Sequence, residues 1–72
     1  MKTEYLKDLT NKELDRMHDI MCEAHQIMKD VIARTGEDRF GNEMYTLTMM
    51  TSISTFQEIQ KRFLNNQKNG NI

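Results

Sequence analysis

The sequence has 72 residues, with ten Lys and Arg against eleven Asp and Glu, so we expect one small and nearly neutral domain. It contains no proline and only three glycines, too few turn-forming residues for a β-sandwich or β-barrel. The balanced charge argues against nonspecific nucleic-acid binding, and the single cysteine, Cys22, excludes an intrachain disulfide framework.

The first predicted element is a short helical turn over residues 2–9. Its apolar side chains, which we expect to lie against the rest of the chain, are Tyr5, Leu6 and Leu9. Thr10 and Glu13 follow with the spacing of a capping box, in which each side chain accepts a hydrogen bond from the other residue's backbone N–H. The pair predicts that a helix begins at Thr10.

The second element is an amphipathic helix over residues 10–35. Apolar residues recur every three or four positions from Leu14 to Val31, as expected for a helix with one buried face. The pattern ends before Gly36, a residue that can adopt the left-handed conformation common at helix C-termini.

The third element is a helix over residues 43–65, with Asn42 as its N-cap. Alternation of apolar and Thr residues from Tyr45 to Thr55 is also typical of a strand. A four- and three-residue apolar spacing continues to Phe63, however, and only a helix explains the whole span. A Glu58–Arg62 pair at i,i+4 supports the same interpretation.

Residues 65–72 are polar and are predicted to form a disordered tail, which leaves residues 1–64 as a single domain. The predicted fold class is all-α: an antiparallel two-helix hairpin with a short N-terminal helical turn. No apolar segment follows the charged N-terminus, so we expect no signal peptide and a cytoplasmic location. The uncharged run over 44–57 is too short and too polar to span a membrane.

The third element carries apolar residues on two faces, whereas a helix in an isolated hairpin needs only one. Chains of this size also rarely support a core alone. We therefore expect a homo-oligomer, a dimer or larger, that packs as a helical bundle. The predicted oligomer interface consists of Met49, Met50, Ile53 and Phe56.

His18, Cys22 and His25 share one side of the second element at i, i+4 and i+7. Adjacent pairs could hold a metal ion, but the two histidines lie about 10 Å apart along a helix, too far for one ion. We favour histidines at the edge of an interface with an incidental thiol, and predict no metal site and no cofactor. A pH response of the histidines is left open.

Basic and hydroxyl side chains near the turn suit a phosphate-bearing ligand, because arginine forks and hydroxyls hold phosphate oxygens and tyrosine stacks on bases. The predicted ligand-binding residues are Lys29, Arg34, Arg39, Tyr45, Thr48 and Thr51. The alternative, which we favour for the hydroxyls, is that small side chains simply allow close helix packing.

An acidic ridge on the second element, formed by Asp15, Asp19 and Glu23, could dock a basic protein surface, although most such ridges are solvated faces. DNA binding through basic residues near the C-terminus ranks last among the alternatives, because each chain has few positive charges. Those residues are Lys61, Arg62 and Lys68.

Two stretches of the sequence define a family resemblance: Leu9-Thr10-x-x-Glu13-Leu14-Asp15-x-Met17-His18-x-Ile20, and the helix from Tyr45 to Phe56. They resemble the helical hairpin of phage cyclic-oligonucleotide sponges that block CBASS immunity. That resemblance implies an oligomer that sequesters signalling nucleotides between subunits without degrading them. The chain departs from the family pattern at His18, Met21, Ala24 and Tyr45, where Asn, Lys, Gly and Trp occur, so no binding residue is transferred.

No nucleophile elbow, phosphate-binding glycine loop or zinc-protease motif occurs in the sequence, and we expect no enzyme. The expected function is that of an oligomeric binding protein, a phage-type or bacterial inhibitor that sequesters a phosphate-bearing nucleotide signal. The alternative is a helical adaptor that inhibits or regulates a partner protein through the acidic ridge or a methionine-rich face.

Overall fold

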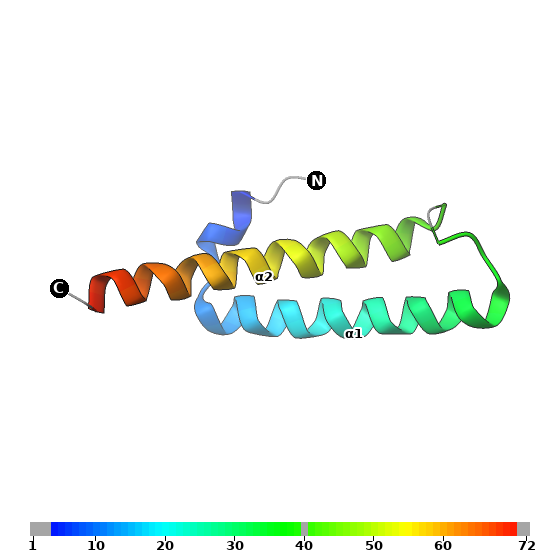
Figure 1. Ribbon diagram of the computed structural model, residues 1–72, viewed down its shortest axis with the longest axis horizontal. Coiled ribbons are helices and arrows are strands. Elements are labelled where there is room, and N and C mark those ends of the chain that lie inside the picture. Colours follow the sequence, from blue (N-terminus) through cyan, green and yellow to red (C-terminus); the bar gives the residue numbers. More distant parts are fainter. Residues whose placement is uncertain (1–3, 40, 71–72) are drawn as a thin grey trace.

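The computed structural model describes residues 4–39 and 41–70, and it confirms the antiparallel two-helix hairpin. A 3-10 helix, η1 (Glu4–Asp8), precedes two long α-helices, α1 (Asn11–Thr35) and α2 (Glu43–Gly70). The helices run side by side in opposite directions, and α2 projects beyond the start of α1 (Figure 1). The part of the chain described contains no strand.

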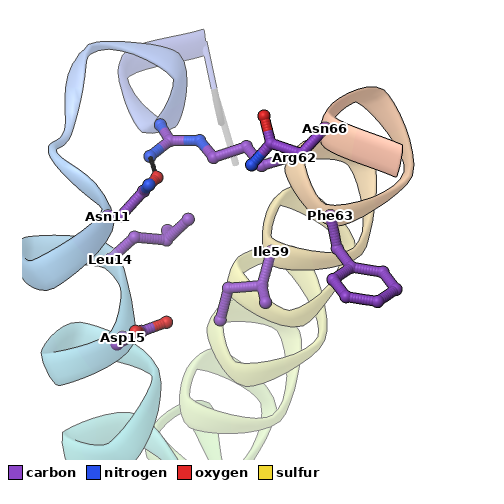
Figure 2. A pocket seen from close by; sticks show the side chains of 7 residues that line it. All are labelled: Asn11, Leu14, Asp15, Ile59, Arg62, Phe63 and Asn66. Atoms are coloured by element: carbon purple, nitrogen blue, oxygen red, sulfur yellow. Dashed lines mark hydrogen bonds between the residues drawn. The ribbon is translucent and has the colours of Figure 1, made fainter. Parts of the chain in front are cut away.

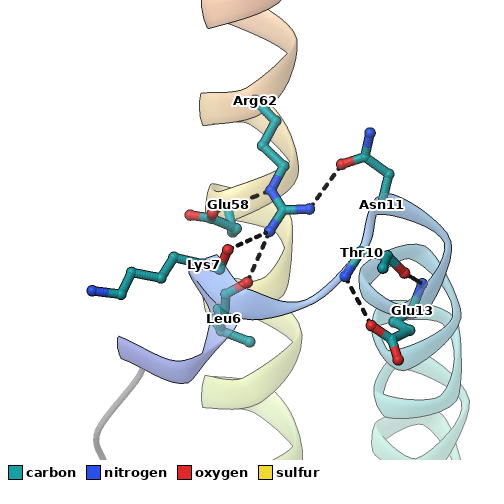
Figure 3. Close-up of polar contacts among 7 residues, drawn as sticks. All are labelled: Leu6, Lys7, Thr10, Asn11, Glu13, Glu58 and Arg62. Carbon is teal, nitrogen blue, oxygen red and sulfur yellow. Dashed lines mark hydrogen bonds and ion pairs between the residues drawn. The ribbon is translucent and has the colours of Figure 1, made fainter.

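The predicted capping signals set the ends of α1. The Thr10 hydroxyl accepts from the Glu13 backbone N–H at 3.1 Å, and the Glu13 carboxylate accepts from the Thr10 N–H at 2.8 Å (Figure 3). These bonds satisfy donors that a helix N-terminus otherwise leaves unpaired. At the other end Gly36 has φ 74° and donates its N–H to the Ile32 carbonyl at 2.8 Å.

Asn42 begins α2 as predicted, because its side-chain oxygen accepts from the Tyr45 N–H at 2.9 Å. The predicted end is wrong: α2 continues through residues 65–70, which we expected to be disordered, and residues 71–72 lie outside the described part. Adding one residue to an existing helix gains a backbone hydrogen bond, so polar residues without a proline continue the helix.

The apolar core is small. Among the described residues, Leu6 and Leu14 are the buried apolar side chains, with 3% and 1% of their surface exposed. Leu9 is half-buried and Tyr5 keeps 45% of its surface exposed, so Leu6 is the most deeply buried of the three apolar residues predicted to lie against the hairpin. The helical turn over 2–9 is confirmed as η1 for residues 4–8.

Three threonines of α2, Thr48, Thr51 and Thr55, are buried against α1. Thr48 donates its hydroxyl proton to the Met44 carbonyl at 2.8 Å, and Thr55 donates to that of Thr51 at 2.9 Å. The short side chains thereby satisfy their own polar groups and bring the helix backbones close. The burial of these three threonines agrees with the interpretation that small hydroxyl side chains allow close helix packing.

Arg62 ties η1 to both helices (Figure 3). Its guanidinium forms an ion pair with Glu58 at 3.2 Å, as the i,i+4 spacing predicts, and donates to the Asn11 side chain at 2.8 Å. It also donates to the backbone carbonyl of Leu6 at 2.9 Å. One planar group thus satisfies acceptors from three elements.

Replacing Arg62 by Lys should lower the free energy of unfolding by about 1–3 kcal/mol, because an ammonium cannot reach the three groups that the fork serves. Urea denaturation measures the change. Arg34→Lys is the matched control, since Arg34 is exposed, and it should leave the transition midpoint unchanged. Equal midpoints for both variants would contradict this role of Arg62.

The hydrogen bond from the Thr10 backbone N–H, together with the nearby Thr10 side chain, lowers the pKa of Glu13 below its usual range, because both favour the charged form. Ionised Glu13 therefore stabilises the fold above the unfolded-state pKa, and this stabilisation is lost as the pH falls through the folded-state pKa. The melting temperature of the wild type should exceed that of Glu13→Gln at neutral pH, and this difference should vanish in acid. A difference independent of pH would contradict the prediction.

Candidate functional site

The candidate ligand site is a groove of about 240 Å³ at the turn end of the hairpin. Its lining residues are Lys29, Ile32, Ala33, Arg39 and Tyr45. They come from the last turns of α1, the connecting loop and the first turn of α2. The groove is thus lined by two cationic side chains, one aromatic ring and two apolar residues.

His25 holds Tyr45 in this groove. The two rings lie with centroids 4.7 Å apart and planes inclined at 47°. His25 Nδ1 lies 3.1 Å from the Thr48 hydroxyl, which already donates its single proton to a backbone carbonyl of α2. The hydroxyl can therefore only accept, so His25 donates through Nδ1 and its ring orientation is fixed.

His18 repeats this arrangement two turns earlier on α1. Its Nδ1 lies 2.8 Å from the Thr55 hydroxyl, whose proton goes to a backbone carbonyl, and its ring lies 6.0 Å from that of Phe56. Nδ1 is again the donor, which leaves Nε2 to accept from the exposed Cys22 thiol at 3.5 Å. The histidines are thus half-buried contacts between the helices.

No group of three or more His, Cys, Asp or Glu side chains that could hold a metal ion occurs in the described part of the chain. The Cys22–His18 contact is a hydrogen bond between a thiol and a ring nitrogen one helical turn apart. Within this part of the chain, every buried side-chain nitrogen and oxygen also has a hydrogen-bond partner.

The structure brings together three of the six predicted ligand-binding residues. Lys29, Arg39 and Tyr45 line the turn groove. Thr48 and Thr51 do not, because only 2% and 6% of their surfaces are exposed and they lie between the helices. The remaining residue, Arg34, is exposed in the last turn of α1 and is not among the lining residues.

The predicted acidic ridge, Asp15, Asp19 and Glu23, is exposed on α1. None of the three carboxylates forms an ion pair within the described residues. The acidic ridge is therefore accessible to a basic partner. The same arrangement is also typical of an ordinary solvated helix face.

A second groove, of about 190 Å³, lies at the open end of the hairpin (Figure 2). Its lining residues are Asn11, Leu14, Asp15, Ile59, Arg62, Phe63 and Asn66. Arg62 spans the top of this groove toward Asn11, so its guanidinium is engaged in contacts within the fold. Of the predicted DNA-binding residues, the exposed Lys61 remains, and the side chain of Lys68 lies outside the described part.

A third groove, of about 350 Å³, runs along the start of α1. Its lining residues are Leu9, Glu13, Arg16, Met17, Ile20 and Met21. The apolar periodicity from Leu14 to Val31 predicts one buried helix face, whereas Ile20, which lies within that span, stays 51% exposed. Ile20 lies outside the three- and four-residue series of apolar positions that begins at Leu14, and this offset is the sequence signal that indicates its exposure.

Among the described helices, none is long and apolar enough to cross a membrane. The chain matches no protein-family model, no curated protein sequence and no solved structure.

Thr55→Val should lower the free energy of unfolding by about 1–3 kcal/mol, because the half-buried Nδ1–H of His18 then loses its acceptor. Thr55→Ser keeps the hydroxyl and should cost only about 1 kcal/mol for the missing methyl. Nitrogen-15 NMR of the imidazole should show the Nδ1–H tautomer of His18 in wild type and Thr55→Ser. A wild-type Nε2–H tautomer would refute the assignment.

Proposed function

We propose that the protein is a non-enzymatic binding protein that sequesters a phosphate-bearing ligand in the turn groove. The observation that carries the proposal is the convergence of Lys29, Arg39 and Tyr45 on one groove. Ammonium and guanidinium groups make charge-assisted hydrogen bonds to phosphate, and a tyrosine ring stacks on a nucleobase. A nucleotide signal carries both chemical groups.

The dimensions of the groove limit what one chain can hold. Its volume of about 240 Å³ is below the range of about 300–1,000 Å³ for sites that enclose a small organic ligand. One chain would hold a phosphate and the group attached to it. A larger ligand would extend to a second chain, as the resemblance to the phage sponges implies.

Binding without turnover fits the way the hydroxyls and imidazoles are used. The His18–Thr55 pair has the composition of a base and a nucleophile, but Thr55 has none of its surface exposed. Its proton is held by a backbone carbonyl. This pair is therefore a structural contact and offers no attacking group to a ligand.

The proposal includes self-association. Ten large apolar side chains of the described residues keep between 42% and 61% of their surface exposed, against two that are buried. The accessible surface of 5766 Å² exceeds by about 1,100 Å² that of a typical folded monomer of this mass. Each partner in a standard protein interface buries about 800 Å².

The second candidate function is inhibition or regulation of a partner protein, favoured by the exposed acidic ridge without ion pairs. Opposite charge on a partner would steer and orient such a complex. The two functions place the working residues on different parts of the chain. Charge reversals can therefore separate them.

Protein purified gently from cells should carry a ligand mass in native mass spectrometry that is lost on denaturation. Lys29→Glu and Arg39→Glu should each reduce that bound fraction, with about a tenfold or greater loss of affinity for added pyrophosphate or dinucleotides. Arg34→Glu is the matched control, because it reverses a nearby charge outside the groove, and should bind like wild type.

Equal losses in all three variants would indicate a general charge effect and contradict the groove assignment. Retention of ligand in the Lys29 and Arg39 variants would contradict it as well. If a partner protein is captured instead, and Asp19→Lys with Glu23→Lys alone abolishes capture, the second function is supported and sequestration is refuted.

A further inference from the structure

We infer that a second copy of this chain covers the outer face of α2 and packs there in the antiparallel orientation. The outer face of α2 is defined as Met49, Met50, Ile53, Phe56, Gln57, Gln60, Phe63 and Leu64. The inference rests on the self-association in the proposed function and specifies the face, the direction and the register.

The outer face of α2 is mostly apolar, with Gln57 and Gln60 as its polar members, and most of it is exposed in the described chain. Ile53 and Phe56 are each 49% exposed, and Phe63 and Leu64 are 61% and 59% exposed. Met49, Ile53, Phe56, Gln60 and Phe63 repeat at four- and three-residue intervals. That spacing forms the continuous stripe by which helices pack lengthwise.

The stretch between Met44 and Gln57 contains no charged residue. Glu58, which follows it, is half-buried and paired with Arg62, so the nearest exposed charged residues of α2 are Glu43 and Lys61, and these have opposite signs. Glu43 and Lys61 are both exposed and lie about five helical turns apart, hence at the same angle on the helix. Neither forms an ion pair within the described residues. An exposed acidic residue therefore precedes the uncharged stretch and an exposed basic residue follows it, beside the part of the stripe that continues to Phe63.

The antiparallel orientation makes use of this arrangement. A two-fold axis near Ser52 and Ile53, perpendicular to α2, brings Glu43 of each copy beside Lys61 of the other and Met49 beside Phe56. A parallel pair would instead keep Glu43 and Lys61 about 27 Å apart along the helix axes. Charge complementarity at both ends therefore selects the antiparallel register.

Disulfide trapping tests the direction, with Cys22→Ser as the background to remove the native thiol. Thr46→Cys and Gln60→Cys are placed on either side of the proposed axis. In the antiparallel pair, position 46 lies near position 60 of the other copy, whereas identical positions lie about 21 Å apart along the axis. A disulfide requires Cα atoms within about 7 Å.

A mixture of the two variants should therefore form a cross-linked dimer on oxidation, and neither variant alone should do so. Self-cross-linking of either single variant would overturn the orientation. A protein of dimer mass that gives no cross-link in the mixture would overturn the assigned face. A monomer by sedimentation equilibrium at micromolar concentration would overturn this inference and the self-association, while leaving ligand binding at the turn groove standing.

Charge exchange tests the register. Glu43→Lys and Lys61→Glu should each weaken the dimer about two- to thirtyfold at low salt, because two symmetric pairs change from attraction to repulsion. The double variant restores opposite charges and should return the dissociation constant to within about threefold of wild type. Lys12→Glu, an exposed reversal on α1, is the control and should have no effect. Additive weakening in the double variant would refute the pairing.

Discussion

The contact between the two helices depends on hydroxyl groups that need no partner outside their own helix. Thr48 and Thr55 give their protons to carbonyls one turn back and then accept from His25 and His18 of α1. A polar group can be buried at little cost when all its hydrogen bonds are made. Because these threonines must face the histidines of α1, the contact between the helices fixes how α2 is rotated about its own axis.

That rotation decides where every other side chain of α2 lies. With threonines inward, Phe56, Ile53 and Phe63 are carried to the sides and the outer face, where much of their surface meets solvent. The same rotation carries Tyr45 to the turn groove, where His25 holds its ring beside Lys29 and Arg39. An exposed apolar face and an ordered cationic groove thus have one structural origin.

The sequence was sufficient for the local features. The capping box at Thr10 and Glu13, the Gly36 C-cap and the Asn42 N-cap each depend on residues close in the chain, so spacing alone predicts them. The rotation of α2 was not predictable in this way, because threonine and the bulkier residues satisfy the same helical periodicity. Whether the threonines or the bulkier residues face α1 depends on which of them fit against its side chains, including the two histidines. The periodicity of one helix carries no information about its neighbour.

Arg62 also has a consequence for the order in which the chain can fold. Its partners Leu6, Lys7 and Asn11 precede it by more than fifty positions, so these contacts close a loop that contains most of the described chain. During synthesis η1 lacks its Arg62 contacts until most of α2 has been made. The docking of η1 through Arg62 is therefore a late event, and a ribosome-bound chain ending before residue 62 would hold a hairpin whose η1 is not yet fixed by these contacts.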